Sequence, residues 1–132
     1  MWIVLAVILL LGLALPAFWS ALQRELRQQR SMKALSAQLQ VIEKALLQAD
    51  CSSMQVGHQF TQLARLASQI HVAFPELLAS APDFAKRQAL LQSEAEAAAG
   101  RALSAASCKT LMPSYQKTEM ACESCHRALR GN

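Results

Sequence analysis

The sequence has few aromatic, charged or β-branched residues. Aromatic residues make up 5% of the 132 positions and charged residues 17%, whereas hydrophobic residues make up 53%. Alanine, leucine and glutamine dominate, and β-branched residues become scarce after position 10. Because β-branched and aromatic residues are the ones that favour strands, this composition argues against a β-rich fold and favours an all-α domain.

Long basic runs and the residue patterns of enzymes are also missing from the sequence. The net charge of +4 is mild, and basic residues are not interleaved with aromatic ones, so we do not expect nucleic-acid binding. No carboxylate pair, nucleophile–base arrangement or phosphate-binding loop stands out. We therefore expect a protein that is not an enzyme, with one domain and an appendage.

Charged side chains are absent before Arg24. The first 19 residues read MWIVLAVILLLGLALPAFW, a run just long enough to cross a bilayer as a helix. Trp2 and Trp19 bracket this run about 25 Å apart, which suits two interfacial rings. We predict a transmembrane signal anchor over residues 1–23 that binds the membrane, followed by a folded domain over residues 24–132.

A cleaved signal peptide is the alternative interpretation of this segment. It fits less well, because no Lys or Arg precedes the apolar run and no clean small-x-small cleavage site follows it. One feature opposes an anchor with the domain outside: Arg24, Arg27 and Arg30 directly follow the span, against the positive-inside tendency. Both interpretations carry the remaining residues out of the cytoplasm.

Four later stretches carry apolar residues at three- and four-residue steps, which predicts four amphipathic helices. Their predicted bounds are Arg24 or Ser31 to Asp50, Ser53 to Phe74, Pro82 to Cys108, and Pro113 to Arg130. Ser52 or Ser53 can cap the second helix, and Pro75 should end it. The short connections predict an antiparallel up-down four-helix bundle.

One motif carries recognisable chemistry: CESCH, with Cys122, Cys125 and His126 in the last predicted helix. CxxCH is the attachment pattern of c-type haem. Two thiols on one helical turn can form thioethers with the two vinyl groups of a porphyrin, and the following histidine supplies a proximal imidazole to the iron. A thioredoxin-like pair would need a βαβ surround, and structural zinc usually needs two clusters. We predict one covalent haem c, with Glu123 and Ser124 facing solvent.

A CxxCH motif near the C-terminus of an exported four-helix chain resembles the class II c-type cytochromes, the cytochrome c-prime family. The resemblance covers about residues 27–130 and includes the FP that closes the second helix and RQQRSMKAL at the start of the first. It implies that Met32 is a distal ligand of the haem iron, as in six-coordinate members, and that Arg27 or Arg30 binds a haem propionate.

The predicted topology supports Met32 independently, because the first helix starts at the end of the bundle where the fourth helix finishes. The alternative is that Met32 is simply the first core residue of its helix. His71 lies at the same end and is the second choice of ligand, whereas Met54 and Met112 lie at the opposite end. Met120 precedes the motif on its own helix.

Cys51 and Cys108 remain after the haem takes two cysteines. Both are expected at the end of the bundle away from the haem, and in an oxidising compartment they can form a disulfide. The alternative is a pair of buried free cysteines. A non-reduced mass measurement distinguishes the two.

These features predict a membrane-anchored monohaem cytochrome that passes single electrons in the bacterial periplasm, with its anchor in the cytoplasmic membrane. Its expected partner is a redox protein or a respiratory or photosynthetic membrane complex. The alternative is a five-coordinate haem protein that binds a small gas such as nitric oxide, with an apolar residue such as Leu35 over the iron. A structural accessory subunit is a third possibility.

Overall fold

The computed structural model describes the backbone of residues 2–130 and the side chains of residues 15–129. Over this range the chain is helical with short connections and contains no strand, so the all-α prediction is confirmed. The helices are α1 (Trp2–Leu47), α2 (Ser53–Ser68), α3 (Ile70–Ala73), α4 (Pro75–Ser80), α5 (Pro82–Ser104), the 3-10 turn η1 (Cys108–Leu111) and α6 (Met112–Arg130).

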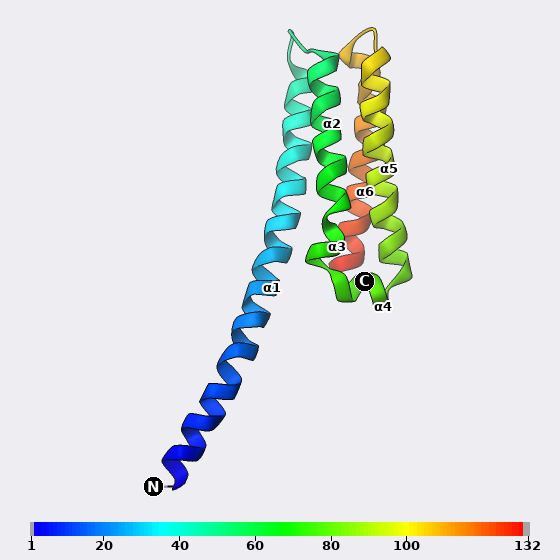
Figure 1. Cartoon of the computed structure of the whole chain (residues 1–132). Helices are drawn as coiled ribbons and strands as arrows, with labels where there is room; N and C mark the ends of the chain where they lie inside the picture. The colour runs from blue at the N-terminus through cyan, green and yellow to red at the C-terminus, as the bar shows by residue number, and fades with distance from the viewer. Residues whose placement is uncertain (1, 131–132) are drawn as a thin grey trace.

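Four of these helices form the bundle, and they alternate in direction along the chain in the order α1, α2, α5, α6 (Figure 1). The α1–α2 and α5–α6 connections lie at one end, which we call the loop end. The short helices α3 and α4 lie at the other end with the C-terminus of α6, and we call this the C-terminal end. The first half of α1 extends beyond the C-terminal end and stands clear of the other helices.

The first helix is longer than the predicted domain helix, because α1 runs without a break from Trp2 to Leu47 and includes Pro16. No strong helix breaker separates the apolar N-terminal segment from the bundle. Within the part of the chain whose side chains are described, no helix is long and apolar enough to cross a membrane. Most of the predicted span, residues 1–14, lies outside that part.

The second predicted helix is divided where we expected continuity. Ser52 caps its start, since its hydroxyl accepts a hydrogen bond from the backbone N–H of Gln55 at 3.4 Å. The helix ends at Ser68. The backbone N–H of Gln69 caps this end by donating to the carbonyl of Leu66 at 3.1 Å. Pro75 does not simply end a helix: it opens the short helix α4, a position where its missing N–H costs nothing.

The third and fourth helices also differ slightly from their predicted bounds. The third predicted helix corresponds to α5 and ends at Ser104 instead of Cys108, because Ala105 adopts an extended backbone. The fourth predicted helix corresponds to α6 and begins at Met112, one residue before the predicted Pro113. Cys108 therefore lies in the 3-10 turn between the two helices.

The centre of the bundle is the contact between α2 and α5. Phe60 and Leu63 of α2 and Leu91 of α5 are fully buried there. Small residues let the two backbones approach: a Cβ built on Gly57 would lie 2.9 Å from the Cβ of Ala102. Ala102 belongs to the alanine-rich helix α5, whose small side chains permit this close approach.

Polar side chains join neighbouring helices across this core. The side-chain amide of Gln38 on α1 donates to the backbone carbonyl of Gln59 on α2 at 3.1 Å. The side-chain amide of Gln88 on α5 donates to the carbonyl of Ala67 on α2 at 2.9 Å. Among the described side chains, every buried nitrogen or oxygen has a hydrogen-bond partner.

The two cysteines outside the motif form a disulfide at the loop end of the bundle. Cys51 is bonded to Cys108, with their Cα atoms 6.1 Å apart. The bond ties the α1–α2 connection to the turn between α5 and α6. The predicted disulfide is therefore present in the structure.

Candidate haem-binding site

A hollow of about 340 Å³ lies between α1 and α6. Helix α1 packs mainly on α2, and α6 packs mainly on α5, so the facing sides of α1 and α6 are less tightly filled. The hollow is lined by Met32, Leu35, Ser36 and Leu39 from α1, and by Glu119, Met120, Cys122, Glu123 and His126 from α6. The structure thus brings Met32, Cys122 and His126 to one cavity.

The helical spacing of the CESCH motif explains how α6 presents these groups. Cys122 and His126 are four residues apart, so both side chains lie on the face that looks into the hollow. Cys125 is turned toward the core and is 3% exposed. Ser124 is not the solvent-facing residue we expected, because the guanidinium of Arg87 on α5 donates to its hydroxyl and to its backbone carbonyl.

Cys122 and Cys125 are free thiols, in contrast to the bonded pair at the loop end. Burial raises the pKa of Cys125 to about 11, and the nearby Cys122 contributes to the rise. Burial also raises the pKa of Cys122, with a smaller contribution from Glu119. Both side chains are consequently neutral thiols at pH 7. Their chemistry fits the two thioethers of haem c.

The burial of Cys125 has a consequence for how a porphyrin could reach both thiols. One thiol opens on the hollow, and the other lies behind it in the packed core. A porphyrin bonded to both would have to enter before α1 closes on α6, or would spread these two helices apart.

Two side chains of α1 on the opposite wall of the hollow, Met32 and Leu35, face His126 across the space that a haem would occupy. Met32 is half-buried and carries a thioether that can ligate iron. Leu35 lies one turn further along α1, is 2% exposed and is inert toward iron. Met120 also lines the hollow, but it lies on the same helix as His126.

The predicted propionate partners Arg27 and Arg30 lie elsewhere. Both line a separate hollow of about 500 Å³ that faces α2 and α3 and includes Leu66 and Val72. They project from a different side of α1 than Met32, so the structure does not bring them to the Met32–His126 hollow.

The second-choice ligand His71, and the methionines Met54 and Met112 that were set aside, do not line this hollow. His71 is exposed, and its Nδ1–H donates to the backbone carbonyl of Ser68. Met54 is exposed at the start of α2, and Met112 lies beside Cys51, so both are at the loop end, as expected.

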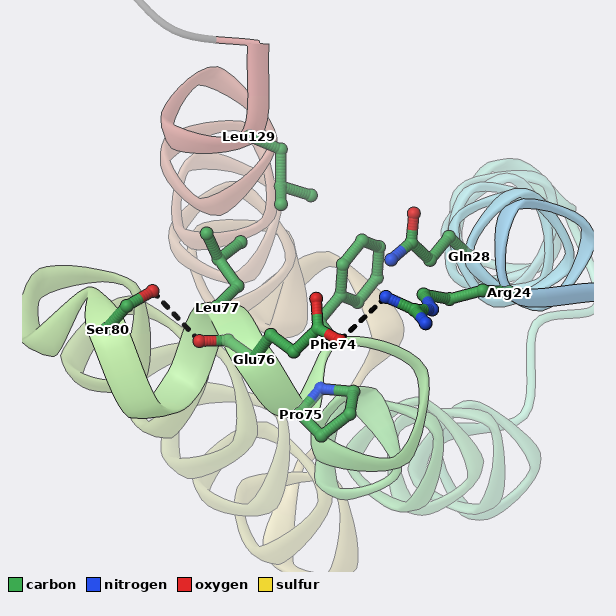
Figure 2. A pocket seen from close by; sticks show the side chains of 8 residues that line it. All are labelled: Arg24, Gln28, Phe74, Pro75, Glu76, Leu77, Ser80 and Leu129. Atoms are coloured by element: carbon green, nitrogen blue, oxygen red, sulfur yellow. Dashed lines mark hydrogen bonds and ion pairs between the residues drawn. The ribbon is translucent and has the colours of Figure 1, made fainter. Parts of the chain in front are cut away.

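Sequence reasoning missed the cation on the Met32 side of α1, which is Arg24. Figure 2 shows Arg24 and Gln28 facing Phe74, Leu77 and Leu129 across a hollow of about 430 Å³ at the C-terminal end. A guanidinium nitrogen of Arg24 lies 2.6 Å from a carboxylate oxygen of Glu76 on α4. The sequence does contain a pattern that predicts this placement: positions 24, 28 and 32 are four residues apart, which puts Arg24 on the same side of the helix as Met32.

Comparisons of the chain with known protein families, with curated proteins and with solved structures give no match. The interpretation of the site therefore depends on its own residues and their arrangement.

Proposed function

We propose that this chain is a membrane-anchored monohaem c-type cytochrome that carries single electrons on the periplasmic side of the bacterial cytoplasmic membrane. The observation that supports this most is the shared hollow: Cys122 and His126 of the CxxCH motif face Met32 from the opposite helix. The sequence motif accounts for one wall of the hollow. The packing of α1 against the bundle accounts for the other.

Each residue has a distinct part in this proposal. Cys122 and Cys125 hold the porphyrin through thioethers, and His126 supplies the proximal imidazole. Met32 supplies the distal thioether, which favours the reduced state and raises the potential. The bound haem supplies a one-electron iron couple. For its propionates, Arg24, Arg27 and Arg30 all lie outside this hollow; Arg24 is the one on the Met32 side of α1, and it would have to exchange Glu76 for a propionate.

The position of the hollow suits electron exchange near a membrane. It lies toward the C-terminal end, from which the free part of α1 extends (Figure 1). Met32 is 13 residues beyond Trp19, which corresponds to about 20 Å along a continuous helix. A membrane complex, or a redox protein docked to one, is therefore the partner that this arrangement favours.

The visible absorption spectrum of the reduced protein tests the axial ligands. We expect a sharp low-spin band in the parent chain that is lost in Met32→Ala. Met54→Ala is the matched control, since Met54 is 75% exposed at the loop end and should leave the band unchanged. A high-spin spectrum in the parent would contradict ligation by Met32.

A second candidate function has one observation in its favour. Leu35 lines the same hollow and is almost fully buried, so an apolar side chain is available above a five-coordinate iron if Met32 turns away. Such a protein would bind a small gas such as nitric oxide at the open position. Rapid binding of carbon monoxide to the reduced parent would support this function, and slow or absent binding would support electron transfer.

A further inference from the structure

The part of α1 that precedes the bundle carries a row of exposed apolar side chains. Leu15, Trp19, Leu22 and Leu26 are between 41% and 63% exposed, and Phe18 beside them is 68% exposed. Exposed apolar residues scattered singly are ordinary on protein surfaces, but a contiguous row marks a surface that contacts another protein or a membrane. We call Leu15, Trp19, Leu22 and Leu26 the α1 seam.

The spacing of the α1 seam is that of a coiled coil. The steps between its members are four, three and four residues, as for alternating a and d positions of a heptad. The next positions in the same register are Gln29, Lys33 and Ser36, which are polar. The apolar seam therefore stops where α1 begins to pack on the bundle.

The α1 seam faces away from the bundle. Helix α1 contacts the bundle through Met32, Leu35, Leu39, Ile42 and Leu46. At about 100° per residue, the centre of the seam lies roughly 150° around the helix from the centre of that bundle-facing set. A second helix can therefore lie along the seam without meeting this chain's own bundle.

The charges beside the α1 seam identify the occupant that fits. With Trp19 and Leu26 at a positions, Glu25 takes a g position and Arg30 the following e position. In a parallel pair of identical helices, the g residue of one lies beside the next e residue of the other. Glu25 of each copy would then face Arg30 of the other copy, and both residues are exposed.

We propose that the α1 seam is the dimer interface of this protein, occupied by the same seam of a second copy in parallel. Lipid can cover Leu15, Trp19 and Leu22, which lie within the predicted anchor, but it fits Leu26 poorly, because Arg24, Glu25 and Arg27 surround that end of the seam. The seam spans about 16 Å from Leu15 to Leu26, which is short for a coiled coil. The pairing therefore needs the full chain, in which α1 continues toward the N-terminus.

Cysteine cross-linking of the full-length chain in membranes tests the contact. In a parallel two-fold pair Leu22 meets Leu22 of the other copy, so Leu22→Cys should cross-link to a dimer under mild oxidation. Ala21→Cys is the matched control, since Ala21 lies at the same level and is exposed on another side of the helix. Several-fold more dimer from Leu22→Cys than from Ala21→Cys supports the proposal, and equal yields or no dimer overturn it.

Charge reversal of the full-length chain in detergent tests the identity of the partner. The parent should sediment with twice the protein mass of 14.4 kDa. Glu25→Arg and Arg30→Glu should each lower the dimer fraction, and the double variant should restore it. A monomeric parent, or a double variant that is not restored, overturns the proposal in favour of lipid or a different helix. None of these readouts involves haem, so failure here is distinct from failure of the proposed function.

Discussion

Removing the disulfide should lower the stability of the bundle by about 4 kcal/mol. The perturbation is the double variant Cys51→Ala with Cys108→Ala. The bond joins residues separated by 57 positions, and a loop of that length gives about 4 kcal/mol in the chain-entropy description of cross-links. That is a large part of the total expected for a domain of this size. Urea unfolding followed by far-ultraviolet circular dichroism measures the difference.

Reduction of the parent chain with dithiothreitol serves as the control for this prediction. If the cross-link itself is responsible, the reduced parent and the double alanine variant should lose similar amounts of free energy. The bond lies at the loop end, whereas His126 lies in the last turns of α6 near the C-terminal end, so haem content should not change. A loss below about 1 kcal/mol in both would refute the chain-entropy argument for this bundle.

Two further predictions concern the packing and titration of single residues. Gly57→Ala should destabilise the fold by about 1 kcal/mol in urea unfolding, because its new methyl would meet Ala102. Gly100→Ala should instead stabilise the fold by about 0.5–1 kcal/mol, since no atom of another helix lies within 4 Å of a Cβ built there. A Gly57→Ala variant more stable than Gly100→Ala would contradict the close contact between α2 and α5. Burial, and then Glu119, raise the pKa of Tyr115 to about 12. The stability that this residue contributes should therefore be present below pH 10 and lost as the pH rises through 12, and an ultraviolet titration of this single tyrosine with a midpoint near 10 would refute it.

Much of the fold follows from sequence patterns whose physical basis is local. The three- and four-residue spacing of apolar side chains predicts the four bundle helices, and Ser52 caps the helix that it precedes. The break at Gln69 could not be predicted, because Gln69 has no helix-breaking property. Gln88 of α5 donates to the Ala67 carbonyl near this helix end, a tertiary contact that the apolar spacing does not reveal.

The candidate site was predictable in part for the same reason. The CxxCH motif places Cys122 and His126 on one side of a helix, and the up-down topology brings Met32 opposite to them. The side chains of Arg27 and Arg30 were harder to place, since their direction depends on how α1 rotates against the bundle. That rotation is fixed by the burial of Leu35 and Ile42, and it places Arg24 on the Met32 side of α1, in the hollow next to Glu76.

The most direct test of the central claim is the intact mass of the denatured, non-reduced protein after expression with a c-type haem attachment system. The account predicts that the parent chain is heavier than its polypeptide by one haem and has no thiol that can be alkylated. It also predicts that Cys122→Ala with Cys125→Ala carries no added mass. A parent chain without added mass, with Cys122 and Cys125 both alkylated, would contradict the account.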